Sequence, residues 1–112
     1  MSDCLIIGGG IIGLLTAREL AAEGATVTVV EREPAAGRES SWAGGGILSP
    51  LQPWRAPEPV LALARWGQTR YAELAQQLQD ETGTDAEWTQ SGMLCLDIDE
   101  QAEALAWAAR GK

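Results

Sequence analysis

The sequence contains no histidine and only two cysteines, Cys4 and Cys95, among its 112 residues. A catalytic dyad that depends on histidine is therefore impossible within these residues. The two cysteines are far apart and have no C-x-x-C spacing, so we expect no metal site. Cys95 also lacks a basic neighbour that would favour its thiolate, and the simplest prediction for it is a small buried apolar residue.

Basic residues are scarce as well, with 8 Lys and Arg against 16 Asp and Glu, a formal net charge of −8. Such a chain repels nucleic acids and anionic membrane surfaces. No apolar run approaches the roughly 20 residues of a membrane span. The apolar stretch 5–15 contains four glycines, follows Asp3 and lacks the basic leader of a signal peptide. We therefore predict a cytoplasmic protein with neither nucleic acid nor membrane as partner.

Glycine, in contrast, is abundant near the start, where the apolar run 4–7 leads directly into a G-x-G-x-x-G motif. Gly8 permits a tight turn, Gly10 lets the backbone approach a pyrophosphate, and Gly13 lets the following helix pack closely on the sheet. The N-terminus of that helix would face the anion with unpaired N–H groups. The motif predicts a nucleotide-binding turn.

The flanking residues predict the elements that this turn requires. Residues 3–7 form a short continuous apolar run, typical of a parallel strand covered on both faces. Residues 11–23 carry a small and apolar face and precede Gly24, a helix C-cap. Residues 25–31 form a second apolar run. Together they predict one right-handed βαβ unit of an α/β, Rossmann-like fold.

Glu31 ends the second run, 18 residues after Gly13 (31 minus 13), at the carboxyl end of its strand, where such sheets bind ligands. Its carboxylate can accept hydrogen bonds from both ribose hydroxyls of an adenosine, and it would repel a 2′-phosphate, which disfavours NADP. The residues by themselves leave FAD and NAD open. They also leave two positions open for Arg32, near the adenine or in solvent.

A loop over residues 37–50 contains Ser40, Ser41 and three successive glycines, 44–46. These residues expose backbone N–H groups and let the main chain pass close to a flat or anionic group. Flexible linkers rarely carry Trp, Ile and Leu among their glycines, as this segment does. The loop therefore predicts a further part of a cofactor site.

Residues 3–32 and the following GRESSWAGGGILSPLQPW resemble the N-terminal portion of the D-amino-acid-oxidase-like family of FAD-dependent amine oxidases. Within that family, RESSWAGGGILSP is most similar to the glycine oxidases of thiamine biosynthesis. The resemblance implies FAD as cofactor and a set of contacting residues. They are Gly8, Gly10, Gly13, Ile11 and Ile12 at the pyrophosphate turn, Glu31 and Arg32 at the adenosine, Ser40 and Ser41 at the phosphates or ribityl chain, and Gly45, Gly46 and Ile47 beside the flavin ring.

The resemblance also implies a reaction, the oxidative deamination of glycine or another small amine to glyoxylate, ammonia and hydrogen peroxide, with O2 as oxidant. In the family, the arginine and aromatic residues of the substrate site come from a later part of a longer chain. We therefore expect an N-terminal fragment, inactive alone, of a longer enzyme for which a homo-oligomer is one open state. No catalytic residue is assigned within this segment. Two alternatives stay open: a sarcosine or D-amino-acid oxidase, and a non-catalytic dinucleotide-binding module.

The second half predicts a proline-punctuated segment, 50–59, and then one long helix that begins near Pro59 and ends at Gly83. An apolar stripe along this helix predicts a core face. The stripe consists of Val60, Leu63, Ala64, Gly67, Tyr71, Leu74, Ala75 and Leu78. Trp42 and Trp54 either pack or approach the flavin or the substrate entrance.

Alternating residues predict a hairpin of strands 88–90 and 92–98, and residues 100–110 predict another helix. The family assigns residues 1–83 to the FAD-binding domain. Residues 84–112 then begin an antiparallel substrate-binding domain.

Overall fold

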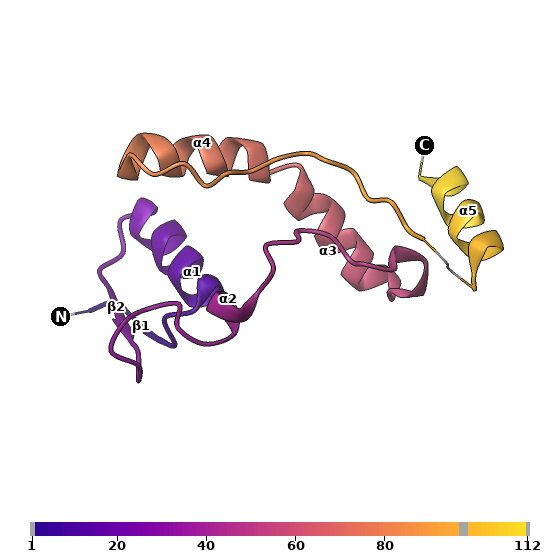
Figure 1. Ribbon diagram of the computed structural model, residues 1–112. Helices are drawn as coiled ribbons and strands as arrows, with labels where there is room; N and C mark the ends of the chain where they lie inside the picture. Colours follow the sequence, from indigo (N-terminus) through magenta and orange to yellow (C-terminus); the bar gives the residue numbers. More distant parts are fainter. Residues whose placement is uncertain (1, 97–98, 112) are drawn as a thin grey trace. The chain divides into compact units, whose positions relative to one another are not determined.

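The computed structural model describes residues 2–96 and 99–111. The chain forms two compact units, the first ending at Gly46 and the second beginning at Ile47. Figure 1 labels the helices and strands of both. The predicted division after residue 83 concerns the domains of the complete protein and stays a prediction.

The first unit is built around a βαβ arrangement. Strand β1 (Cys4–Ile7) is followed by helix α1 (Ile11–Ala22) and strand β2 (Val27–Val30). The strands pair in parallel, with Cys4 opposite Val27 and Ile7 opposite Val30. This confirms the predicted α/β start. β1 and α1 are each one residue shorter than predicted, and β2 is three residues shorter.

Close packing between α1 and the turn before it depends on Gly13. A Cβ atom at this position would lie 2.0 Å from the carbonyl oxygen of Gly8 and 3.3 Å from Cγ2 of Ile6. No side chain is compatible with such distances. The third glycine of the motif is therefore required sterically, as its spacing predicts.

The sheet is not covered on both faces, and here the prediction for residues 3–7 is wrong. Burial alternates along both strands, and α1 contacts each of them. On the other face Leu5 is 64% exposed and Ile7 86% exposed. A continuous apolar run indicates strands that can be buried on both sides, but within the described residues only one side is covered.

The second unit is helical. It contains the 3-10 turn η1 (Pro53–Arg55) and the helices α3 (Glu58–Gln68), α4 (Tyr71–Thr82) and α5 (Gln101–Arg110). The short helix α2 (Ser40–Ala43) belongs to the first unit. Gly83 ends α4 in the left-handed conformation, with φ of 70°, which confirms the predicted stop.

The predicted single long helix is wrong, because it is divided into α3 and α4 at Thr69 and Arg70. The N–H of Thr69 is shared between the carbonyls of Arg65 and Trp66, at 3.3 and 3.2 Å, and the N–H of Arg70 bonds to Gly67 at 2.9 Å. The Thr69 hydroxyl also donates to Trp66 O, at 2.7 Å. These bonds tighten the last turn and end the helix.

The predicted hairpin is also wrong. Residues 84–96 contain no strand, and no backbone hydrogen bonds join residues 88–90 to residues 92–96. Residues 97 and 98, the end of the second predicted strand, lie outside the described residues. Alternation of apolar and polar residues creates a surface suited to a sheet, but a strand exists only where a neighbour supplies the ladder of hydrogen bonds.

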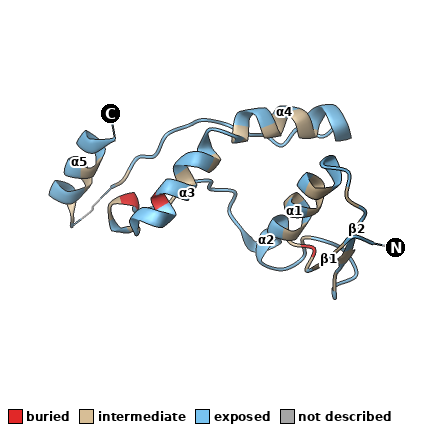
Figure 2. Ribbon diagram, turned by 180° about the vertical axis from the view of Figure 1, so that it is seen from behind, coloured by how far each residue is buried: buried red, intermediate tan, exposed pale blue. Residues whose placement is uncertain are grey.

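Burial is concentrated at very few positions (Figure 2). Leu61 of α3, 7% exposed, is the buried hydrophobic residue of the described chain, and Pro53 and Gly9 are also buried. The predicted core stripe of the second unit is at best half-buried: Val60 is 50% exposed and Leu63 69%. Cys95 is likewise half-buried, not fully enclosed. The stripe is amphipathic in sequence, but the described residues do not cover it.

Among the described residues, no helix has the length and apolar character needed to cross a membrane.

Candidate functional site

The glycine turn between β1 and α1 has the backbone conformation that its sequence predicts. Gly8 has φ of 109°, a value that side-chain-bearing residues rarely adopt, and its N–H donates to the Val30 carbonyl at 2.8 Å. The turn is thus tied to the end of β2. Gly9, the residue between the first two glycines of the motif, is buried.

The carboxylate of Glu31 closes over this turn. Its Oε2 accepts a hydrogen bond from Gly9 N at 2.6 Å, and its Oε1 accepts one from Glu33 N at 2.9 Å. The donors at Glu33 and then Gly9 lower the pKa of Glu31 below its ordinary value, so the side chain is an anion near neutral pH. The carbonyl of Gly9 in turn accepts from Gly37 N at 2.9 Å, which joins the loop after β2 to the turn.

The start of α1 meets a hydroxyl from α2. Ser41 Oγ accepts a hydrogen bond from Ile11 N at 2.9 Å and lies 3.2 Å from where a Cβ atom of Gly10 would be. Within the described residues, the N–H groups of Gly10, Ile12 and Gly13 have no hydrogen-bond acceptor. Three open donors at a helix N-terminus form an anion-binding surface.

Arg32 follows Glu31 in the chain, and its side chain pairs with Glu39, whose Oε1 accepts from Arg32 Nε at 3.0 Å and also from the guanidinium Nη2. This hydrogen bond and the charge of Glu39 raise the pKa of Arg32. Nearby, the guanidinium of Arg38 lies over the ring of Trp42, 5.3 Å from its centroid. The loop that follows β2 is therefore organised by two interactions of arginine side chains.

The structure thus brings together Gly8, Gly10, Ile11, Glu31 and Ser41 around one turn, with Ile12 and Gly13 in the first turn of α1. The remaining predicted residues are not drawn into this cluster. The Ser40 hydroxyl makes no hydrogen bond within the described ranges, and Gly45 and Gly46 have open space where a Cβ atom would be. Ile47 belongs to the second unit.

Two participants were missed from the sequence, Gly9 and Glu39. Gly9 stands inside a run of three glycines, and a Cβ atom there would lie 3.0 Å from Oε2 of Glu31. This close contact exists only because β2 brings Glu31 next to the turn, so the sequence around Gly9 does not reveal it. Glu39, in contrast, follows Arg32 by seven residues in a charged loop.

In the part of the chain that the structure describes, no group of three or more His, Cys, Asp or Glu residues is arranged to hold a metal ion.

A parallel βαβ unit, a glycine turn with open amides and a carboxylate at the end of β2 define the start of a dinucleotide-binding domain of the Rossmann type. Residues 3–112 match the family described as FAD dependent oxidoreductase, DAO. The chain belongs to this family, and the resemblance seen in its sequence is confirmed.

Comparison with individual proteins supports the same family. The chain is 57% identical over 106 residues to a glycine oxidase from Pseudomonas aeruginosa, covering 95% of the chain and 29% of that protein. It is 49% identical over 73 residues to a D-amino acid dehydrogenase from Methylobacterium radiotolerans, covering 62% of the chain and 17% of that protein. The crystal structure of glycine oxidase from Bacillus cereus aligns with this chain with a TM-score of 0.81 and 32% identity. The alignment covers all of this chain and 31% of the Bacillus cereus chain. The chain therefore spans about a third or less of the length of these relatives.

Proposed function

We propose that this chain is the N-terminal part of an FAD-dependent amine oxidase that acts on glycine. The observation that carries the proposal is the 57% identity to a glycine oxidase across 95% of the chain, together with the anion-binding turn of the same segment. We further propose that residues 1–83 belong to its FAD-binding domain and residues 84–112 begin its substrate-binding domain.

The geometry of the glycine turn supports binding of a dinucleotide, and membership of the FAD dependent oxidoreductase family makes FAD our proposal for it. The open N–H groups of Ile12 and Gly13 suit a pyrophosphate, since Gly10 offers no Cβ atom to keep a phosphate away. Glu31 already accepts two backbone hydrogen bonds, but each carboxylate oxygen has two lone pairs. Both oxygens therefore retain capacity for the ribose hydroxyls, and the turn holds the carboxylate in place for them.

Other residues extend this site in the proposal. Arg32 lies beside the adenosine, and Ser40 and Ser41 bind the phosphates or the ribityl chain. Gly45, Gly46 and Ile47 pass beside the flavin ring, where small residues allow close approach of the backbone. The negative charge of Glu31 disfavours NADP, whose 2′-phosphate would be repelled.

The proposed reaction converts glycine, O2 and water into glyoxylate, ammonia and hydrogen peroxide. Bound FAD supplies the two-electron chemistry, and the protein supplies binding and orientation. This chain's residues hold the dinucleotide, and the groups that bind the amine lie in the part of the protein beyond it. We propose thiamine thiazole biosynthesis as the pathway and the cytoplasm as the location, with possible homo-oligomers and neither nucleic acid nor membrane as partner.

A second candidate is an oxidoreductase of the same family with another amine substrate, a D-amino acid or sarcosine. The similarity to a D-amino acid dehydrogenase over 73 residues favours it. That match covers 62% of the chain, whereas the match to a glycine oxidase covers 95%, and glycine is therefore preferred. A non-catalytic dinucleotide-binding module is the alternative outside the enzymes.

The test uses the protein as its gene encodes it. Purification should yield a yellow protein with flavin absorbance, and hydrogen peroxide should be formed with glycine at higher kcat/KM than with sarcosine or D-alanine. A preference for sarcosine or D-alanine would support the second candidate, and bound flavin without any amine oxidation would support the module. In parallel, quenching of FAD fluorescence by residues 1–112, with NAD as control, determines whether this segment binds the cofactor alone.

A further inference from the structure

The second unit contains a cavity of about 360 Å³ that none of the residues proposed for FAD lines. Residues from η1, α3 and α5 surround it, and those that matter for its chemistry are Trp54, Glu58, Leu61, Arg65, Trp107 and Arg110. Its volume falls in the range of small-molecule sites, roughly 300–1,000 Å³. The cavity therefore has the size of a small-molecule site.

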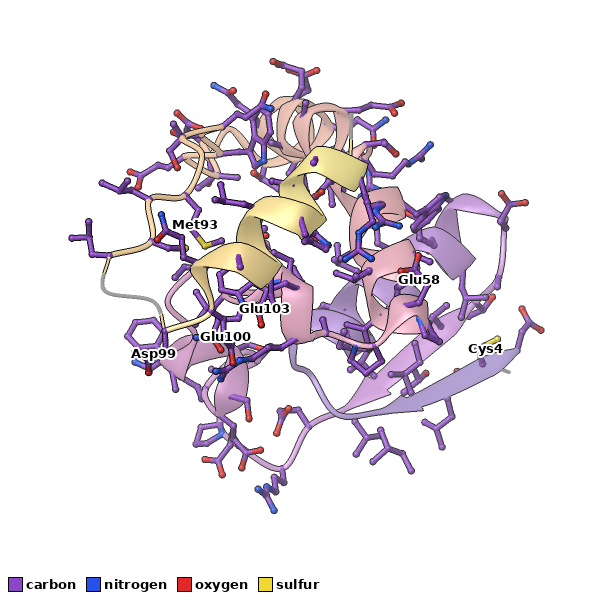
Figure 3. All side chains as sticks on the ribbon, turned by 90° about the vertical axis from the view of Figure 1, so that its right-hand side faces the viewer. Cys4, Glu58, Met93, Asp99, Glu100 and Glu103 are labelled. Atoms are coloured by element: carbon purple, nitrogen blue, oxygen red, sulfur yellow. The ribbon has the colours of Figure 1, made fainter. Side chains whose placement is uncertain are left out.

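One wall of the cavity is held in place by Glu100, the residue that precedes α5 (Figure 3). Its Oε2 accepts from Trp54 Nε1 at 2.8 Å and from Arg55 Nε at 2.6 Å, and its Oε1 accepts from the Arg55 guanidinium. Trp54 and Arg55 are thereby fixed against a residue more than forty positions away in the chain. The indole of Trp54 is thus oriented before any ligand arrives.

The apolar part of the lining is aromatic. Trp54 and Trp107 are both half-buried, and Leu61 is the most buried hydrophobic residue of the described chain. Two indoles and a leucine favour a flat ring, which gains both burial and ring–ring contact against them.

The two arginines of the lining differ in their hydrogen bonds. Arg65 donates through Nη1 to Oε1 of Glu58 at 2.9 Å. Arg110, in the last turn of α5, makes no hydrogen bond or ion pair to any residue in 2–96 or 99–111. A guanidinium with open donors beside aromatic side chains is suited to a planar carboxylate, which it can bind through two parallel hydrogen bonds.

We propose that this cavity binds a small planar aromatic carboxylate. The ring lies against Trp54, Trp107 and Leu61, and the carboxylate pairs with Arg110. Glu100 acts as a positioning residue, because it holds Trp54 and does not itself line the cavity. None of the residues proposed for FAD lines this cavity, so its occupation does not require the proposed oxidase activity.

Isothermal titration calorimetry on the gene-encoded protein tests this, with naphthalene-2-carboxylate as probe and the uncharged naphthalene-2-methanol as its matched control. We expect saturable binding of the carboxylate with a Kd of about 1 mM or tighter, and affinity for the alcohol lower by about tenfold. Arg110→Gln and Trp107→Leu should each weaken carboxylate binding by about tenfold. Arg70→Gln, at an exposed arginine outside the cavity, should leave it unchanged.

Flavin absorbance of each variant separates this site from the dinucleotide site, since Arg110→Gln should retain FAD. The absence of saturable binding up to the solubility limit of the probe would overturn the proposal. So would equal affinity for the carboxylate and the alcohol, or affinity unaffected by both Arg110→Gln and Trp107→Leu, because the probe would then lie elsewhere.

Discussion

The backbone N–H of Gly9 donates a 2.6 Å hydrogen bond to Oε2 of Glu31, which joins the turn after β1 to the end of β2. These residues are 22 positions apart in the chain. The interaction gives Glu31 a structural task besides the proposed binding of ribose. It fixes the carboxylate against the glycine turn that precedes α1.

Acid should weaken this connection. The pKa of Glu31 is lowered in the fold by hydrogen bonds from Glu33 N and Gly9 N. Its contribution to stability is therefore fully present above the ordinary pKa of 4.5 and is lost as the pH falls through the lower folded value. Unfolding by denaturant from about pH 7 to about pH 3 should show a smaller acid-induced loss in Glu31→Gln than in the native protein. Glu103→Gln, at an exposed residue of α5, serves as control; an acid response of Glu31→Gln equal to the native one would contradict the assignment.

Gly9→Ala should weaken FAD binding. The added Cβ atom would lie 3.0 Å from Oε2 of Glu31 and 3.3 Å from Cβ of Ala36, so the carboxylate must move away from the turn. We expect a Kd for FAD raised by about tenfold, the effect of one lost hydrogen bond to a charged group. Flavin fluorescence titration of the apoprotein measures it, and an unchanged Kd would show that the carboxylate adapts without cost.

Gly13→Ala should destabilise the first unit strongly. Its Cβ atom would lie 2.0 Å from the carbonyl oxygen of Gly8, and α1 must shift to make room. We expect a loss of about 1–3 kcal/mol in the free energy of unfolding, typical of overpacking. Gly44→Ala is the matched control, because its Cβ atom makes an ordinary 3.5 Å contact with Ser40 O. Equal stability of the two variants would contradict the close packing.

Ser41→Ala should remove the hydroxyl that satisfies the first N–H of α1. Ser41 Oγ accepts from Ile11 N at 2.9 Å, the same task that an N-cap side chain performs, and its loss typically costs about 1 kcal/mol. Ser40→Ala, in the same helix, removes a hydroxyl that bonds to nothing within the described residues. Chemical denaturation should therefore show a larger loss of stability in Ser41→Ala than in Ser40→Ala. An equal effect of both substitutions would argue against the cap.

Glu100→Ala should release Trp54 and Arg55 from α5. The Arg55 and Trp54 hydrogen bonds lower the pKa of Glu100, so the native connection should persist well into mildly acidic solution and fail only as the pH falls below 4.5. Tryptophan emission should shift to longer wavelength in Glu100→Ala, because the indole of Trp54 loses its partner and gains access to water. Glu103→Ala, one turn further along the helix, should leave the emission unchanged. An emission spectrum of Glu100→Ala identical to that of the native protein would contradict this role.

Much of the first unit is predictable because its signals are local. The apolar run 4–7, the glycines at 8, 10 and 13 and the acid at 31 lie within one short stretch, and each restricts the backbone of its own neighbourhood. The identity of Glu31 as the acid beside the turn follows from the same spacing. Its hydrogen bond to Gly9 does not, because Gly9 is not one of the motif's three defined glycines.

Predictions for the second unit were less successful where they required more than periodicity. The apolar stripe continues from Val60 to Leu78 as one helix would require, yet Thr69 and Arg70 interrupt it through hydrogen bonds that tighten the turn. Residues 88–96 alternate as a strand would, yet they have no ladder partner in the described chain. Periodicity reports which face can be buried and contains no information about what buries it.

The sequence by itself determined the order of strand, glycine turn, helix and strand, the residue at the end of β2, and the stop of α4 at Gly83, because backbone restrictions of glycine and local burial patterns act over a few residues. Only the tertiary structure decided that Glu31 holds Gly9, that Ser41 reaches Ile11 and that Glu100 joins Trp54 to α5. Each of these contacts connects residues more than twenty positions apart, and such pairs form only when the fold brings their elements together.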